Sequence, residues 1–377
     1  MRGRAEKTRR LAWMMLTCAV TALTGCSGFF VPVVPVPPGS AGNYAYVANS
    51  VTGTLSGFTV GTGTLTAVPN SPVTLGFSPV AMVMTPNNQF LYVATLGNIN
   101  VYTVNSNGSL TGATGGTGVA IANVVSMDVS PDGNWLLALD GTSLQAQIDL
   151  FKIDGSTGAL ASVQTARYPI PNAVLVPTML RVSPNGALVF AAMGPGGDAV
   201  FTFDTTAGAL VNSQLLSVAK TTSDNGLAVD SASAKLYIAR SGTGGGVRVF
   251  SIGTGGALNE ITGSPFDSGG QAYTVTLDKT GAYAYAANRA NGTIYGYSIG
   301  TSGALTALGG SPYTSGTQVT SLGVDNSEKY LLAAAAGGSP DLSMYSFDTA
   351  TPGKLILATS TATGTDPTGA IAIALTH

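Results

Sequence analysis

Short apolar runs recur along the whole chain, and turn-forming residues separate them. Some runs are apolar at nearly every position, as in residues 135–139, which is typical of strands buried on both faces. Other runs alternate apolar and polar residues, as in residues 148–153, which is typical of strands with one solvated face. The two patterns together predict an all-β chain of many short strands.

The tripeptide Gly-x-Leu follows the alternating runs and returns at intervals of 45 to 50 residues. Its seven copies begin at Gly63, Gly108, Gly158, Gly208, Gly256, Gly303 and Gly353. A period of this length indicates repeated supersecondary units. In each unit the glycine supplies the positive φ of a tight hairpin, and the leucine begins the next strand.

Each unit predicts four strands, the first two joined by a turn such as Ser-Pro-Asp-Gly at residues 130–133. The first unit opens at residues 44–49 with a strand of the second type, and no first-type strand precedes it. Residues 370–375 form a first-type strand with no unit after it. The last strand therefore completes the first blade, which predicts a closed propeller of seven four-stranded antiparallel blades rather than an open solenoid.

The first 26 residues resemble an export signal. Residues 1–10 are basic, residues 11–23 are apolar, and Leu23-Thr24-Gly25-Cys26 resembles the bacterial lipobox. We expect residues 1–25 to be a lipoprotein signal and Cys26 to be acylated, the alternative being an ordinary secretory signal. Residues 26–42 hold a proline-rich tether, extended or disordered, and residues 43–377 hold the propeller.

These features predict a bacterial cell-envelope protein that is exported and anchored to a membrane through the lipid on Cys26, this being the outer membrane if the host has one. Beyond residue 26 the chain carries 11 basic and 17 acidic residues, a net charge of −6. That balance lacks the basic footprint of a nucleic-acid-binding protein. Both cysteines, Cys18 and Cys26, precede the propeller, so the domain has no disulfide.

The second strands at residues 44–49 and 283–288 end in Tyr-x-x-Asn. With Ser-Pro-Asp-Gly and Gly-x-Leu, this pattern resembles the YVTN-type repeats and the lactonase-like seven-bladed propellers, a group that includes 6-phosphogluconolactonase and muconate-cyclising enzymes. The resemblance covers residues 43–377 and implies the fold. Such enzymes typically carry His in the first strands, whereas the only His of this chain is His377. The resemblance therefore assigns no catalytic residue here.

Composition also restricts the chemistry of the domain. Without cysteine and with a single histidine, it excludes zinc or copper sites and Ser-His or Cys-His catalysis. No nucleophile elbow, dinucleotide fingerprint or P-loop occurs in the sequence. We predict no cofactor and no metal ligands, and leave open only Ca²⁺ held in the channel by Asp and backbone carbonyls.

Two charged residues, Asp128 and Arg181, fall inside first-type strands of successive blades, so we expect a salt bridge between them or a functional charge in the channel. Polar residues also mark the rim where second strands end and first strands begin. The rim candidates are Asn49, Asp140, Asp224, Arg240, Asn288 and Arg289. Arg240 and Arg289 could clamp a carboxylate or phosphate, although rim loops are also polar simply because they are solvated. Asn49 and Asn288 are better explained as turn caps.

We interpret the sequence as a monomeric, lipid-anchored, extracytoplasmic propeller that binds a small molecule, glycan or protein at a loop face. The alternative is a lactonase hydrolysing a sugar lactone at the channel mouth. A third interpretation is a scaffold that contacts other proteins of the envelope. The shape and side chains of the channel mouth discriminate between the first two.

Overall fold

The computed structural model describes residues 42–113, 118–121, 123–141, 145–170, 174–216, 218, 221–364 and 369–377. The chain divides into two compact units, residues 1–37 and 38–377, and the description below concerns the second. The predicted signal, Cys26 and nearly all of the tether lie outside the described residues. Within the described ranges no helix has the length and apolarity to cross a membrane.

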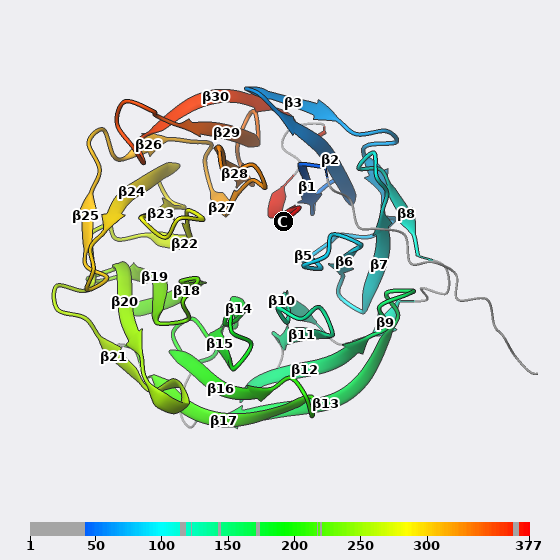
Figure 1. Ribbon diagram of the computed structural model, residues 1–377, viewed down its shortest axis with the longest axis horizontal. Coiled ribbons are helices and arrows are strands. Elements are labelled where there is room, and N and C mark those ends of the chain that lie inside the picture. Colours follow the sequence, from blue (N-terminus) through cyan, green and yellow to red (C-terminus); the bar gives the residue numbers. More distant parts are fainter. Residues whose placement is uncertain are drawn as a thin grey trace, which may run out of the picture. The chain divides into compact units, whose positions relative to one another are not determined.

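Seven antiparallel sheets stand around a central channel, as Figure 1 shows. The strands nearest the channel are β31 (Ala370–Leu375), β5 (Ala81–Met84), β10 (Val124–Val129), β14 (Met179–Val182), β18 (Thr222–Val229), β22 (Ala272–Leu277) and β27 (Val319–Val324). They belong to blades 1 to 7 in that order. Their neighbours, the second strands, are β1 (Tyr44–Asn49), β6 (Phe90–Ala94), β11 (Trp135–Asp140), β15 (Leu188–Ala192), β19 (Lys235–Gly242), β23 (Tyr283–Asn288) and β28 (Tyr330–Ala335).

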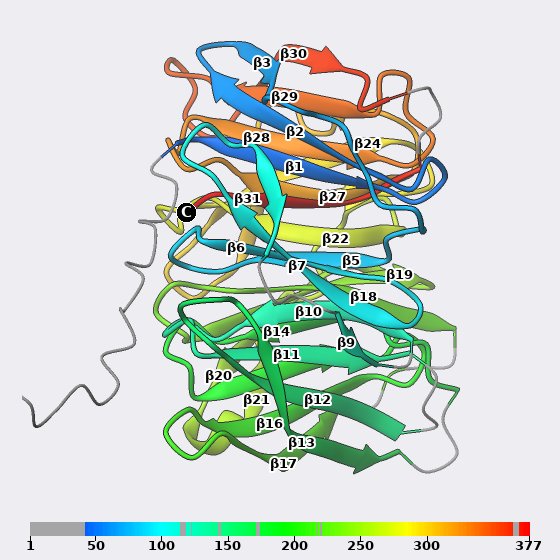
Figure 2. The ribbon, with the colours of Figure 1, turned by 90° about the vertical axis from the view of Figure 1, so that its right-hand side faces the viewer.

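The third strands are β2 (Thr54–Gly61), β7 (Asn98–Val104), β12 (Gln145–Ile153), β16 (Asp198–Asp204), β20 (Gly246–Ile252), β24 (Thr293–Ile299) and β29 (Leu342–Phe347). The outer strands are β3 (Thr64–Ala67), β8 (Leu110–Gly112), β13 (Leu160–Pro169), β17 (Ala209–Leu216), β21 (Leu258–Glu260), β25 (Leu305–Ala307) and β30 (Leu355–Thr361). A single 3₁₀ turn among the described residues, Thr254–Gly256, precedes β21. The strands run across the thickness of the ring, so the inner strands all begin at one face (Figure 2).

The ring closes as the sequence predicts. β31 pairs antiparallel with β1, with Ala45 opposite Leu375 and Val47 opposite Ile373. The Tyr44 N–H also donates a 2.9 Å hydrogen bond to the hydroxyl of Thr376. The four-stranded blades are confirmed, with one addition: β4 (Val73–Thr74), β9 (Val119–Ala120) and β26 (Tyr313–Thr314) each pair with a third strand beside the short outer strand of blades 1, 2 and 6.

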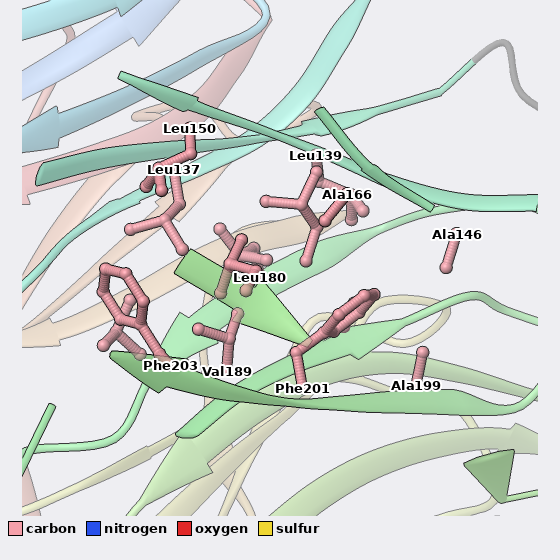
Figure 3. Packing of buried hydrophobic residues seen from close by; sticks show 14 of the residues in the cluster. Leu137, Leu139, Ala146, Leu150, Ala166, Leu180, Val189, Ala199, Phe201 and Phe203 are labelled. Carbon is pink, nitrogen blue, oxygen red and sulfur yellow. The ribbon is translucent and has the colours of Figure 1, made fainter. Parts of the chain in front are cut away.

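Apolar side chains fill the seams between neighbouring blades. Between blades 3 and 4, Leu137 and Leu139 from β11 pack with Leu180 from β14 and Phe201 from β16, as Figure 3 shows. Each of these four side chains is fully buried. The second strands therefore bury both of their faces, which is why their sequences are apolar at nearly every position.

The Gly-x-Leu hairpins are docking points for aromatic residues of the preceding blade. The Tyr46 hydroxyl donates to the Gly108 carbonyl at 2.7 Å, and the Tyr92 hydroxyl donates to the Gly158 carbonyl at 2.8 Å. Blade 7 reaches blade 1 in a related way, because the Gly63 N–H donates to the Tyr330 hydroxyl at 2.9 Å. The repeated glycine thus serves both the hairpin and the seam.

Candidate functional site

A cavity of about 370 Å³ opens where the inner strands begin. We call this cavity the mouth. All seven blades contribute to its lining, and the lining contains the side chains of Arg181 and Arg289. It is the end of the channel at which the sequence places the rim candidates, because second strands end there and first strands start.

A β-bulge at the start of five inner strands determines which side chains enter the mouth. In each case one residue of the inner strand has no partner in the second strand. These unpaired residues are Ile371, Val125, Asn225, Tyr273 and Thr320, and all five line the mouth. Bulges re-aim side chains in this way at barrel rims and beside binding sites. The mouth is therefore built by an irregularity that recurs around the ring.

Arg289 lies one residue beyond the end of β23. Its guanidinium carbon stands 4.5 Å from the centroid of the Tyr273 ring, a cation–π contact that holds the charge over the mouth. Arg181 projects from β14, and its Nη1 donates to the Leu180 carbonyl at 3.0 Å. Among the described residues neither arginine has a carboxylate within 4 Å. Both cations are available to an anionic ligand.

Asp128 is bound to the backbone rather than to Arg181. Its two carboxylate oxygens accept hydrogen bonds from the N–H groups of Val129 at 3.0 Å and Val182 at 2.9 Å. Burial raises the pKa of Asp128, and this outweighs the lowering by the Arg181 charge and by the two backbone hydrogen bonds. The structure thus shows an electrostatic interaction between two adjacent blades in place of the expected salt bridge.

Four of the rim candidates occupy one equivalent position near the end of the second strand. In each case this means the residue that pairs with the inner strand immediately before its bulge, and in blade 5 the pairing continues beyond it to Gly242. The four residues are Asn49, Asp140, Arg240 and Asn288, and each is at most 9% exposed. Asn49 donates to Ser56 and Thr363, and Asn288 accepts from the N–H groups of Ala290 and Asn291 as turn caps do. Asp140 accepts from the Gln147 amide at 3.0 Å. These side chains hold the loops under the rim.

Arg240 forms the most buried ion pair among the described residues. Its Nε and Nη2 donate to the two oxygens of Asp224 at 2.5 and 2.6 Å, in the bidentate geometry that suits guanidinium and carboxylate. Asp224 is fully buried, and because an unpaired buried carboxylate is costly, Arg240 stays bound to it. The predicted clamp of Arg240 and Arg289 does not form, because Arg240 is turned inward against its own sheet.

Asp198, at the start of β16, completes this cluster. It is 1% exposed, and neither of its carboxylate oxygens has a hydrogen-bond partner. Burial, followed by the charge of Asp224, raises the pKa of Asp198 well above its ordinary value, while Arg240 and Arg248 act in the opposite direction. The cluster thus places Asp198 and Asp224 near the guanidinium groups of Arg240 and Arg248, and Arg248 also donates to Glu260 at 2.8 Å.

The opposite end of the channel holds a second cavity of about 630 Å³. Lys279, Glu328 and His377 line it, and Arg181 lines both cavities. Burial and the charge of Lys279 lower the pKa of His377. No three acidic, histidine or cysteine side chains gather closely enough to hold a metal ion within the described part of the chain. A calcium ion in the channel stays a prediction.

The sequence names Arg289 and Arg181 but misses Tyr273, the ring beneath Arg289. The available signal is positional: Tyr273 follows Ala272, the residue that pairs with Asn288 immediately before Arg289. Recognising it requires the bulge, because a regular strand would turn this side chain away from the channel.

Comparison with known proteins places this geometry in a family. A family model described as lactonase, seven-bladed β-propeller, matches residues 39–178, 189–311 and 235–370. No match is found among curated proteins. Because the model covers well over half of the chain, it identifies the family and does more than indicate a shared architecture.

Solved structures share the fold at low identity. A candidate 6-phosphogluconolactonase from Bacteroides fragilis has a TM-score of 0.71 and 17% identity, covering 89% of this chain and 98% of its own. A periplasmic gluconolactonase from Pseudomonas aeruginosa has a TM-score of 0.68 and 15% identity, covering 89% and 99%. Hydrazine synthase from Kuenenia stuttgartiensis has a TM-score of 0.59 and 15% identity, covering 77% and 88%. The family match and the seven closed blades agree: this chain belongs to the family of lactonases with a seven-bladed β-propeller.

Proposed function

We propose that the protein hydrolyses a lactone that carries an anionic group, and that the reaction takes place in the mouth. The observation that carries this proposal is the presence of Arg181 and Arg289 in one cavity, neither neutralised by a described carboxylate within 4 Å. Membership of the lactonase family supports it, and so do the gluconolactonase names of two structural neighbours.

The chemistry needs little beyond these charges. Water adds to the lactone carbonyl and releases a proton to solvent, which leaves a negative charge on the former carbonyl oxygen. The bond between this carbon and the ring oxygen then breaks, and the ring oxygen takes a proton from solvent to give the hydroxy acid. A guanidinium group aimed at the former carbonyl oxygen stabilises the charge as it develops, and a second guanidinium holds the anionic substituent of the substrate. Tyr273 fixes the position of the Arg289 charge before substrate arrives. Asn225 and Thr320, on the bulges beside it, are bonded within the fold: Asn225 Nδ2 donates to the Ala272 carbonyl at 3.0 Å and the Thr320 hydroxyl to the Ala370 carbonyl at 2.7 Å, so they shape the mouth.

A second candidate is the binding of a sugar acid or glycan without turnover. The observation in its favour is that no Asp, Glu or His belongs to the described lining of the mouth, so the lining offers no side chain suited to act as a general base. Under this alternative the two arginines bind the same anionic ligands but do not accelerate their hydrolysis.

The experiment that tests the function is hydrolysis of 6-phosphogluconolactone by the purified protein, followed with a pH indicator. We expect turnover above the spontaneous rate and a roughly hundredfold or greater loss of kcat/KM in Arg289→Ala and in Arg181→Ala. Arg167→Ala is the matched control, since Arg167 is exposed on the outer strand β13 and donates to Gln147. A spontaneous rate in the wild type, with calorimetric binding that needs Arg289, would support the binding alternative.

The cellular address is a separate part of the proposal. The basic start, apolar run and Leu23-Thr24-Gly25-Cys26 favour export and acylation of Cys26, and one structural neighbour is named a periplasmic gluconolactonase. Cells grown with a labelled fatty acid should yield labelled protein, and Cys26→Ser should abolish the label. A wild-type protein that takes up no label would contradict the anchor.

A further inference from the structure

The mouth has two chemically different walls. One wall, from blades 1 to 3, is apolar and consists of Ile371, Ile373, Val80, Met82, Val125 and Met127. The other wall, from blades 4 to 7, is more polar: it includes Met179 and Ala336 but also Arg181, Asn225, Tyr273, Arg289, Thr320 and Ser321. The bulges show the same division, since they aim Ile371 and Val125 from one side and Asn225, Tyr273 and Thr320 from the other.

The serine and threonine hydroxyl groups on both walls are bonded to the backbone, so the two arginines are what distinguish the polar wall. Ser50 donates to the Gly369 carbonyl at 3.0 Å, and Ser126 accepts from the Leu180 N–H at 3.0 Å. The apolar wall therefore offers a ligand little hydrogen bonding. A polyhydroxylated sugar placed against it would lose water from its hydroxyl groups without gaining partners, which is unfavourable.

Apolar side chains continue beyond the cavity on the same blades. Val51, Phe77 and Leu96 are 72%, 41% and 69% exposed. They lie in the connections that follow β1, precede β5 and follow β6, which belong to blades 1 and 2 at the face where the mouth opens. Met82 and Met127 add flexible, polarizable contacts that adapt to ligands of different shape. Exposed apolar side chains thus lie on the loops of the same blades that form the apolar wall.

We infer that the ligand is amphipathic: a lactone, or the hydroxy acid derived from it, with an anionic group for the arginines and an alkyl or aryl group for the apolar wall. This inference rests on the proposed function for the lactone ring and on the two walls for the rest. Apolar pockets with a few converging polar groups bind ligands of this composition. A fully hydroxylated sugar lactone matches only half of the mouth.

Binding of two six-carbon carboxylates tests the inference without requiring turnover. Hexanoate and gluconate carry the same charge, but only gluconate carries hydroxyl groups. Isothermal titration calorimetry of the full-length protein should show hexanoate binding at least tenfold more tightly, since each buried methylene improves affinity about fourfold. Equal affinities, tighter binding of gluconate, or no binding of hexanoate would overturn the inference.

Substitutions in the apolar wall test whether it causes the expected preference for hexanoate over gluconate. Met82→Ser should weaken hexanoate binding severalfold and leave gluconate binding unchanged. Val80→Thr, at a half-buried position, keeps the test decisive if the buried methionine proves essential for folding. Val163→Ser is the matched control, because Val163 is 48% exposed on β13. A hexanoate preference that survives both wall variants would contradict the assignment.

Turnover separates this inference from the proposed function. A γ-butyrolactone carboxylate is compared with the same lactone carrying a hexyl chain, and we expect the chain to raise kcat/KM at least tenfold. Hexanoate preference without turnover of either lactone would defeat the hydrolase and uphold the amphipathic ligand. Equal turnover of the two lactones would uphold the hydrolase and defeat the amphipathic ligand.

Discussion

Two positions one residue apart show how the ring divides structural from functional side chains. Arg240 pairs with the inner-strand residue just before the bulge of blade 5, whereas Arg289 follows the equivalent residue, Asn288, in blade 6. Arg240 is 9% exposed and bound to Asp224, while Arg289 lies over Tyr273 and lines the mouth. A shift of one residue turns a side chain to the opposite side of a strand, so similar sequence signals lead to different roles.

The equivalent positions in other blades follow the same division. Asn49, Asp140 and Asn288 occupy the position equivalent to Arg240, which pairs just before the bulge, and all three are buried. Ser50 follows Asn49 as Arg289 follows Asn288, and both Ser50 and Arg289 line the mouth. We therefore expect substitutions at the buried position, occupied by Arg240 and Asn288, to change stability. Substitutions at the position after it, occupied by Ser50 and Arg289, should change ligand binding.

The largest expected loss of stability comes from breaking the buried pair of Asp224 and Arg240 in blade 5. Asp224→Ala leaves the Arg240 guanidinium buried without its partner, which should cost about 3–5 kcal/mol of unfolding free energy. Urea denaturation measures the loss. The exposed pair of Lys354 and Asp348, at 3.9 Å, provides the control, because Lys354→Ala should cost less than about 1 kcal/mol. Similar losses in the two variants would contradict the distinction.

The next effect concerns a seam rather than the rim. Gly208 has φ 65°, and a Cβ added there would collide with the Trp135 ring of the preceding blade. Gly208→Ala should cost about 2–4 kcal/mol, the sum of a left-handed backbone and an overpacked contact. Gly63→Ala is the matched variant, since Gly63 has φ 68° in the same motif with no atom within 4 Å. It should cost about 1–2 kcal/mol in the same urea titration.

The smallest expected change is a gain of stability. Because burial raises the pKa of Asp198 in the folded protein, ionisation of this carboxyl opposes folding. The wild type should lose stability as the pH rises above the unfolded carboxyl pKa of about 3.9, until the folded pKa is passed. Asp198→Asn stays neutral and can donate to Asp224, so it should be more stable near pH 7. Thermal unfolding at several pH values measures this, and the difference between the two proteins should vanish near pH 4. A variant less stable at neutral pH would show that Asp198 is ionised.

Sequence reasoning reaches the fold because the seams repeat. Gly-x-Leu marks the hairpin between the third and outer strands of every blade. The second-type strand that opens at Tyr44 predicts the closure of the ring. The two-residue strands such as β4 and β26 escape prediction, since segments this short carry no periodicity. Repeats encode what every blade must do to pack against its neighbours.

The mouth is harder to predict because it depends on departures from the repeat. Arg289 and Arg181 can be named from their places near the channel, but the bulges that expose Tyr273 and Asn225 have no sequence signature of their own. The ion pair of Arg240 requires the register between β18 and β19, which counting from turns does not supply. Hydrazine synthase shares the ring as well, so the architecture alone does not determine the chemistry.

The junction of β31 with β1 has a consequence for biogenesis. Tyr44 and Thr376 are joined by a hydrogen bond although 332 residues separate them in sequence. The edge of β1 that pairs with β31 therefore has no partner until the ribosome has made nearly all of the chain. Contacts of such long range are slow to form and expose edges to aggregation meanwhile. A polypeptide that closes its ring only with its last strand also stays incompletely folded throughout its synthesis.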